Sequence, residues 1–208
     1  AQFKVSSTFK KYSKVSNARG MTGAEVARMI LDKNGLSYIS IQRVSGNLTD
    51  HYDPKQNVIR LSDSVYNSTS IGAIGVAAHE AGHAVQYGED YGPIKLRSAI
   101  IPVCNIGSSI SPILLMIGLL FESVGLFTLG IVAFSMMAVF QLITLPVEFD
   151  ASKRAIRILD NSGMFSTEEV KGSKKVLSAA AMTYVAALLT SLMQILYYIS
   201  RFSGRRRN

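Results

Sequence analysis

Hydrophobic positions along the chain gather into three long runs that follow a mixed first half. The runs cover residues 98–121, 124–147 and 176–200, and none of them contains Lys, Arg, Asp or Glu. A membrane-spanning helix takes about 20 consecutive apolar residues, so each run predicts one span. The tip around Glu122 between the first two runs is too short for anything but a hairpin. We therefore expect a mainly α-helical, multi-pass protein of the cell membrane.

The polar half before the first run predicts a small α+β module. Its clearest helix begins at Thr22, which stands at capping-box spacing from Glu25. Gly35 suits the left-handed residue that closes a helix. Residues 38–44 and 57–62 predict strands, and the segment that joins them is rich in turn-forming residues.

The stretch GVAAHEAGHAVQYG predicts a helix over about residues 70–87. Positions i and i+4 of a helix share a face, so His79 and His83 can bind one metal ion. Glu80 directly follows the first histidine, where a carboxylate can act as general base on a water at the metal. Gly82 leaves room for a neighbouring element to approach. The pattern predicts a zinc site, and the alternative is two incidental histidines on a packed helix.

A catalytic zinc site takes three protein ligands and keeps a further position open for water. Glu148 is the favoured third ligand because it lies just past the second run, which the hairpin returns to the side of the histidines. The alternative for Glu148 is a solvated carboxylate at the membrane boundary. The other residues with suitable chemistry are His51, Asp50, Asp53, Glu89, Asp90 and Asp150.

Composition and charge bear on the surroundings of the chain. The 208 residues are 48% hydrophobic and carry a net charge of +8, which favours anionic lipid over nucleic acid as the partner of the basic residues. The short basic loop after the second run predicts a cytoplasmic catalytic face, although the basic tail after the third run argues the other way.

The only cysteine is Cys104, so no intrachain disulfide can form. The basic stretch that follows Ala1 predicts a further span upstream.

Four stretches taken together, LTDHYDP, VAAHEAGHAVQY, LPVEFDAS and VLSAAAMTYVAALL, resemble the YugP-type neutral zinc metallopeptidases of bacterial membranes. The resemblance covers about residues 3–198. It implies a gluzincin-like site in which both histidines of the motif and Glu148 bind zinc and Glu80 is the catalytic base. The helix of Glu148 also resembles that of HtpX-type and CAAX-prenyl proteases, but Ser152 stands where those relatives have an aspartate. Members of the family begin with an N-terminal span, in agreement with the one expected upstream.

The sequence therefore predicts a membrane-integrated zinc endopeptidase that holds one Zn²⁺ per chain and acts on protein or peptide substrates. Its expected parts are a zincin-like module (1–97), a transmembrane hairpin (98–147), a helical segment with the third ligand (148–175), and a third span with a basic tail (176–208).

Several points stay open at this stage. His51 is a second candidate catalytic residue, and a structural role in a turn is an equal alternative. His51, Tyr52 and Tyr87 are candidates to stabilise the oxyanion. Two other functions compete with the endopeptidase: a site-2-type intramembrane metalloprotease, and a metal-stabilised membrane scaffold or partner-binding subunit. A membrane protein partner or a homo-oligomer is also open.

Overall fold

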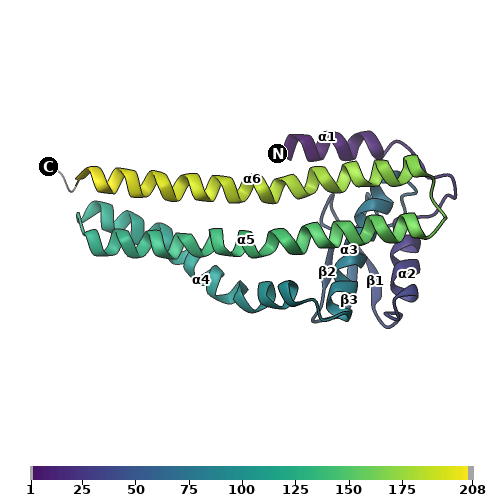
Figure 1. Cartoon of the computed structure of the whole chain (residues 1–208), viewed down its shortest axis with the longest axis horizontal. Helices are drawn as coiled ribbons and strands as arrows, with labels where there is room; N and C mark the ends of the chain where they lie inside the picture. Colours follow the sequence, from purple (N-terminus) through teal and green to yellow (C-terminus); the bar gives the residue numbers. More distant parts are fainter. Residues whose placement is uncertain (1, 206–208) are drawn as a thin grey trace. The chain divides into compact units, whose positions relative to one another are not determined.

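The computed structural model describes residues 2–205, with side chains placed as far as Arg201. The described chain is mostly helical and contains one three-stranded sheet (Figure 1). The elements are α1 (Gln2–Tyr12), α2 (Gly23–Lys33), β1 (Ser40–Val44), β2 (His51–Asp53), β3 (Val58–Ser62), α3 (Ile71–Gly88), α4 (Gly92–Leu120), α5 (Val124–Asn161) and α6 (Thr167–Arg205). The predicted combination of a small α+β module with long apolar helices is confirmed.

The chain forms two compact units. The first comprises residues 1–91 and 147–183, and the second comprises residues 92–146 and 184–208. The sheet, α2, α3 and the candidate metal ligands all belong to the first unit. The domain boundaries given by the sequence remain a prediction.

Within the described residues, three helices are long and apolar enough to cross a membrane. They are Gly92–Leu120, Val124–Asn161 and Thr167–Arg201. α4 begins before the apolar run that predicted it, α6 extends past both ends of its run, and α5 continues without a break past the end of its run. The polar residues after position 147 are therefore held on a regular helix.

The sheet has the order β1-β3-β2. β1 pairs with β3 in parallel, with Ser40 opposite Val58, and β2 pairs with β3 in antiparallel fashion, with His51 opposite Arg60. The sequence did not predict β2, which lies inside the turn-rich segment. A strand of three residues is too short to show the period-two alternation that reveals longer strands.

The capping contacts that the sequence predicts at the two ends of α2 are present in the structure. The Thr22 hydroxyl accepts a hydrogen bond from the Glu25 backbone N–H, and the Glu25 carboxylate accepts one from the Thr22 N–H. Gly35 adopts the left-handed φ of +72° that closes α2. These contacts fix the ends of α2, whose apolar face joins the core of the first unit.

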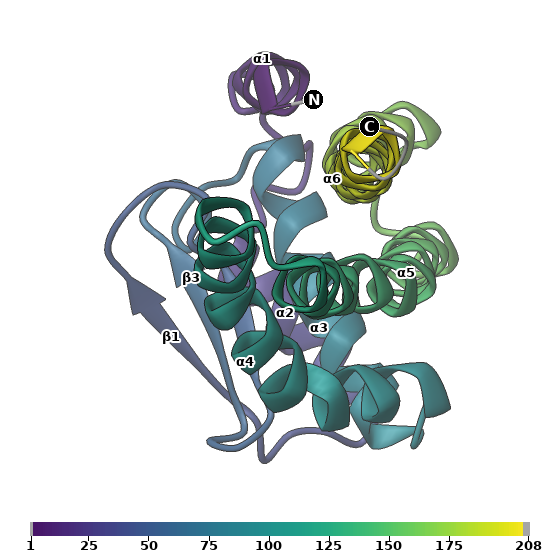
Figure 2. The same ribbon diagram turned by 90° about the vertical axis from the view of Figure 1, so that its left-hand side faces the viewer.

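Helix α3 is the central element of the first unit. It lies between the strands and the first-unit part of α5 (Figure 2). Its small residues permit close packing, most of all at Gly82: a Cβ added there would meet the carbonyl oxygen of Ala151 at 2.8 Å. The prediction that Gly82 lets a neighbouring element approach is confirmed, and the neighbour is α5.

The first-unit part of α5 presents a buried stripe toward this core. Val147, Ala151, Ala155 and Leu159 recur every fourth position and are fully buried. Because residues four apart share one helix face, the stripe also determines where Glu148 points. Packing on small residues therefore brings the end of the second apolar run against the histidine helix.

Candidate metal centre

Three side chains with ligand chemistry converge between α3 and α5. His79 Nε2 lies 3.2 Å from Glu148 Oε2, and His83 Nε2 lies 3.6 Å from the same oxygen. One ligand atom from each residue lies within 4.8 Å of the other two. Among the candidates that the sequence offered for the third ligand, the structure brings Glu148 to the two histidines.

The spacing of these atoms fits a zinc ion. Zinc binds histidine nitrogen and carboxylate oxygen at about 2.0–2.1 Å, so neighbouring ligand atoms of a tetrahedral site lie about 3.4 Å apart. The two distances to Glu148 fall on either side of that value. Two imidazoles and one carboxylate also form a donor set used by catalytic zinc sites, in which further positions stay open.

Gln86 orients His83 through the ring nitrogen Nδ1, which is directed away from the metal position. Its amide nitrogen donates to the Val147 carbonyl at 2.9 Å and to the Asp150 carboxylate at 2.8 Å. Both partners are pure acceptors, so the Gln86 amide oxygen must face His83 Nδ1, which lies 3.0 Å away. His83 Nδ1 therefore carries the proton and donates it, and Nε2 is directed to the metal position.

Ser152 occupies the corresponding position behind His79. Its hydroxyl oxygen lies 3.2 Å from His79 Nδ1. The sequence alone does not assign a role to this residue, because the HtpX-type and CAAX-prenyl proteases that this helix resembles have an aspartate here. A hydroxyl can accept the imidazole N–H as a carboxylate does, but without the negative charge, so it orients the ring with less effect on its basicity.

Glu80 and the negative charge beside His83 complete the inner part of the site. Glu80 is 8% exposed and follows His79 on α3. Burial of His83 opposes a positive charge, yet the hydrogen bond and negative charge of Glu148, with the charge of Glu80, raise the pKa of His83 above its ordinary value. The cluster is therefore rich in negative charge and suited to a cation.

A polar chain continues from the metal centre to the surface. Asp150 accepts from both Gln86 and Arg154, and Arg154 also donates to Glu89. The Arg154 guanidinium lies 5.5 Å from the centre of the Tyr91 ring. Sequence reasoning considered Asp150 and Glu89 as metal ligands. The structure instead places both carboxylates in this series of hydrogen-bonded polar residues, outside the metal group found among the described residues.

His51 is not part of the metal group found among the described residues. It is exposed on β2, where Nδ1 is 2.8 Å from the Thr49 carbonyl and Nε2 is 3.4 Å from an Arg60 nitrogen. Its neighbour Asp50 accepts from the backbone N–H and hydroxyl of Ser62, while burial raises the pKa of the Asp50 carboxyl. These contacts fit the structural alternative for His51, and its catalytic role stays a prediction.

Two tyrosines connect β2 with α3. The rings of Tyr52 and Tyr87 meet edge to face at 5.6 Å between centroids. Burial, with smaller contributions from neighbouring groups, raises the pKa of Tyr52 to about 12. The Tyr52 hydroxyl therefore stays protonated at neutral pH and can donate a hydrogen bond.

The described residues combine a histidine pair and a glutamate on packed helices with three helices able to cross a membrane. These are features of membrane zinc metallopeptidases. The family model described as "Putative neutral zinc metallopeptidase" matches residues 1–203, and the chain belongs to this family. The "Putative membrane protease YugP" of Bacillus subtilis (strain 168) is 53% identical over 209 residues, which cover 100% of this chain and 93% of that protein. No solved structure matches the chain. The resemblance stated from the sequence motifs is confirmed.

Proposed function

We propose that the protein is a membrane-integrated zinc endopeptidase of the gluzincin type. In this proposal His79, His83 and Glu148 hold one Zn²⁺, and Glu80 is the general base. The observation that carries it is the convergence of the three ligand atoms within 4.8 Å, at separations that suit tetrahedral zinc.

The proposed chemistry divides between the metal and Glu80. A zinc ion held by His79, His83 and Glu148 would supply Lewis acidity toward a water molecule and toward the carbonyl of the scissile peptide bond. The Glu80 carboxylate accepts a proton from the attacking water, and the resulting carboxylic acid delivers it to the departing amine. Gln86 and Ser152 keep the two imidazoles in place throughout, because both act on Nδ1 and leave Nε2 directed inward.

Substrate binding is proposed along β2. This strand lies at the edge of the sheet and contacts α3. An extended peptide can add to such an edge through main-chain hydrogen bonds, which give affinity with little dependence on side chains. Tyr52 and Tyr87 lie at the junction of β2 and α3, and either hydroxyl is a candidate donor to the oxyanion.

We further propose that all three long helices cross the membrane and that the metal centre lies on the cytoplasmic side. The support is the excess of Lys and Arg in the loop between the second and third apolar runs. The test replaces Cys104 with serine and places one cysteine at the exposed position 55 (Lys55→Cys). A membrane-impermeant maleimide should label it in inverted vesicles. Labelling in intact cells would contradict the orientation.

The endopeptidase proposal is tested with purified protein in detergent and a casein-type peptide. Glu80→Gln removes the base but none of the proposed ligands, so zinc content should stay near one ion per chain while cleavage falls by at least about a hundredfold. Asp32→Asn, on the exposed face of α2, is the control and should cleave like the wild type. Undiminished cleavage by Glu80→Gln would remove Glu80 from the mechanism. Bound zinc without any cleavage in the wild type would favour the scaffold alternative.

A further inference from the structure

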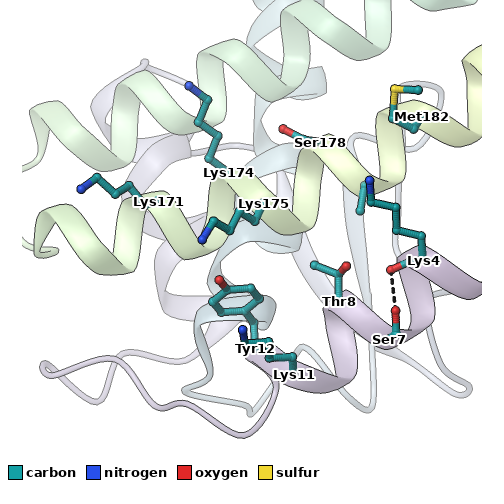
Figure 3. A pocket seen from close by; sticks show the side chains of 11 residues that line it. Lys4, Ser7, Thr8, Lys11, Tyr12, Lys171, Lys174, Lys175, Ser178 and Met182 are labelled. Carbon is teal, nitrogen blue, oxygen red and sulfur yellow. Dashed lines mark hydrogen bonds between the residues drawn. The ribbon is translucent and has the colours of Figure 1, made fainter.

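A groove with lysines on both sides lies between α1 and the first part of α6 (Figure 3). Its volume is about 750 Å³. Lys4 and Lys11 come from α1, and Lys171, Lys174 and Lys175 come from α6. Among the described residues that line it, there is no aspartate or glutamate. We propose that this groove binds the phosphate-bearing headgroup of an anionic phospholipid.

Helical periodicity gathers the lysines on two facing surfaces. On α1, the groove residues recur at intervals of three and four positions from Lys4 through Thr8 to Lys11, so they share one face. The same intervals relate Lys171, Lys175 and Ser178 on α6. The groove is thus formed by one face of α1 and by the part of α6 from Lys171 to Met182, and both belong to the first unit.

Packing at one end of α1 determines the shape of the groove. Phe9 packs against Gly72 of α3, where an added Cβ would lie 3.4 Å from its ring. Tyr12 packs still closer to Gly172 of α6, where an added Cβ would meet the ring at 2.9 Å. Two glycines therefore let α1 dock against α3 and α6, and this docking forms the wall that carries Lys4 and Lys11.

The groove concentrates positive charge that the protein compensates only in part. Lys171 pairs with Glu168 at 2.9 Å, and within the described residues the ion pairs include none to the other four lysines. Like charges that line one groove repel, and an anion bound among them relieves that repulsion. Ammonium groups are strong donors to phosphate oxygens, and the hydroxyls of Thr8 and Ser178 add neutral donors.

The surroundings favour a lipid over free phosphate. After Lys175, α6 carries no charged residue until Arg201. Ala179 and Met182 continue the groove along that apolar direction. A second cavity of about 330 Å³ shares Lys174, Ser178 and Met182 with the groove. It is also lined by the apolar side chains of Ile156, Leu177 and Ala181. A headgroup at the lysines would therefore have apolar surface beside it for an acyl chain.

The test uses native mass spectrometry of the purified full chain in detergent with an equimolar mixture of phosphatidylglycerol and phosphatidylcholine. The wild type should retain phosphatidylglycerol selectively. The triple variant Lys11→Gln, Lys174→Gln, Lys175→Gln should retain at least about tenfold less. The control, Lys10→Gln, Lys33→Gln, Lys55→Gln, removes the same charge from exposed positions outside the groove and should bind like the wild type. Equal losses in both triples, or equal retention of the two lipids, would overturn the proposal.

A second variant distinguishes lipid binding inside the groove from attraction of the lipid by charge alone. Ser178→Trp fills the groove and leaves every lysine in place, so it should also lose phosphatidylglycerol, and unchanged retention would contradict the proposed position. Excess inorganic phosphate provides the remaining arm. Displacement of the lipid by inorganic phosphate as readily as by soluble phosphatidylglycerol would show that the apolar surface contributes nothing, and would assign the groove to free phosphate. The zinc content of the same samples reports separately on the metal centre.

Discussion

Substitution of Gly82 by alanine tests whether α5 must approach α3 as closely as the structure shows. A Cβ at this position would lie 2.8 Å from the Ala151 carbonyl oxygen, whereas ordinary contacts begin at 3.4 Å. The difference of 0.6 Å has to be met by separation of the two helices, because the opposing atom belongs to the backbone. Ala151 lies three residues after Glu148 on α5, so this separation moves the third ligand away from the histidines.

Two effects of opposite sign determine how Gly82→Ala changes the free energy of unfolding. Alanine exceeds glycine in helix propensity by about 1 kcal/mol, which would stabilise α3. Overpacking of a core contact costs about 1–3 kcal/mol, so the net change in the free energy of unfolding should lie between neutral and about 2 kcal/mol of destabilisation. Zinc affinity is the sharper readout, because metal–ligand distances tolerate only about ±0.2 Å. We expect Gly82→Ala to weaken zinc binding by at least about tenfold.

The assay is zinc titration against a competing chelator in detergent, with thermal unfolding of the metal-free protein measured alongside. Gly92→Ala is the matched control, since among the described residues no atom of a packed neighbour lies within 4 Å of a Cβ added there. It should keep the zinc affinity of the wild type. Wild-type zinc affinity in Gly82→Ala would refute the inference that close packing of α5 on α3 positions Glu148.

Three further predictions follow from the contacts around the site and at α2. Gln86→Leu should lower zinc affinity by about 10–100-fold, because His83 Nδ1 and the Val147 carbonyl lose their partner; titration of the purified variant checks this, and unchanged affinity would exclude the orienting role. Ser152→Ala should weaken zinc binding, by up to about tenfold, and Ser152→Asp should bind at least as tightly as the wild type; the reverse order would show that the hydroxyl does not orient His79. The Thr22 backbone N–H and hydroxyl hold the pKa of Glu25 below its usual 4.5, so this cap stabilises the fold at neutral pH and is lost as pH falls through the lowered value. Glu25→Gln should therefore melt below the wild type at pH 7, and this difference should shrink as the pH falls below 4.5. A difference that stays the same as the pH falls would contradict this.

Local sequence signals predicted the parts of this protein that depend on neighbours along the chain. The helix of His79 and His83 was predicted over about 70–87 and is Ile71–Gly88. The capping contacts of α2 and the left-handed glycine that closes it follow from interactions among residues close in sequence. Glu148 could also be favoured as the third metal ligand, because a hairpin of two spans returns the chain to the side of the membrane from which it started.

Other features depend on contacts that no local pattern encodes. Gln86 reaches the Val147 carbonyl across 61 positions, and Ser152 reaches His79 across 73. Gln86 carried one available signal, since it lies three residues after His83 and shares its helix face. β2 escaped prediction because it is a three-residue strand whose existence depends on pairing with β3. The groove between α1 and α6 depends likewise on packing at Gly72 and Gly172.

The central claim is that His79, His83 and Glu148 together hold one zinc ion. X-ray absorption at the zinc edge tests it most directly, because this method counts the histidine and oxygen ligands at the metal. The wild type should show two histidine nitrogens and the remaining ligands as oxygen at about 2.0–2.2 Å. Glu148→Gln should lose most of its zinc. A wild-type spectrum with three histidines, or full zinc occupancy in Glu148→Gln, would contradict the account and direct attention to His51.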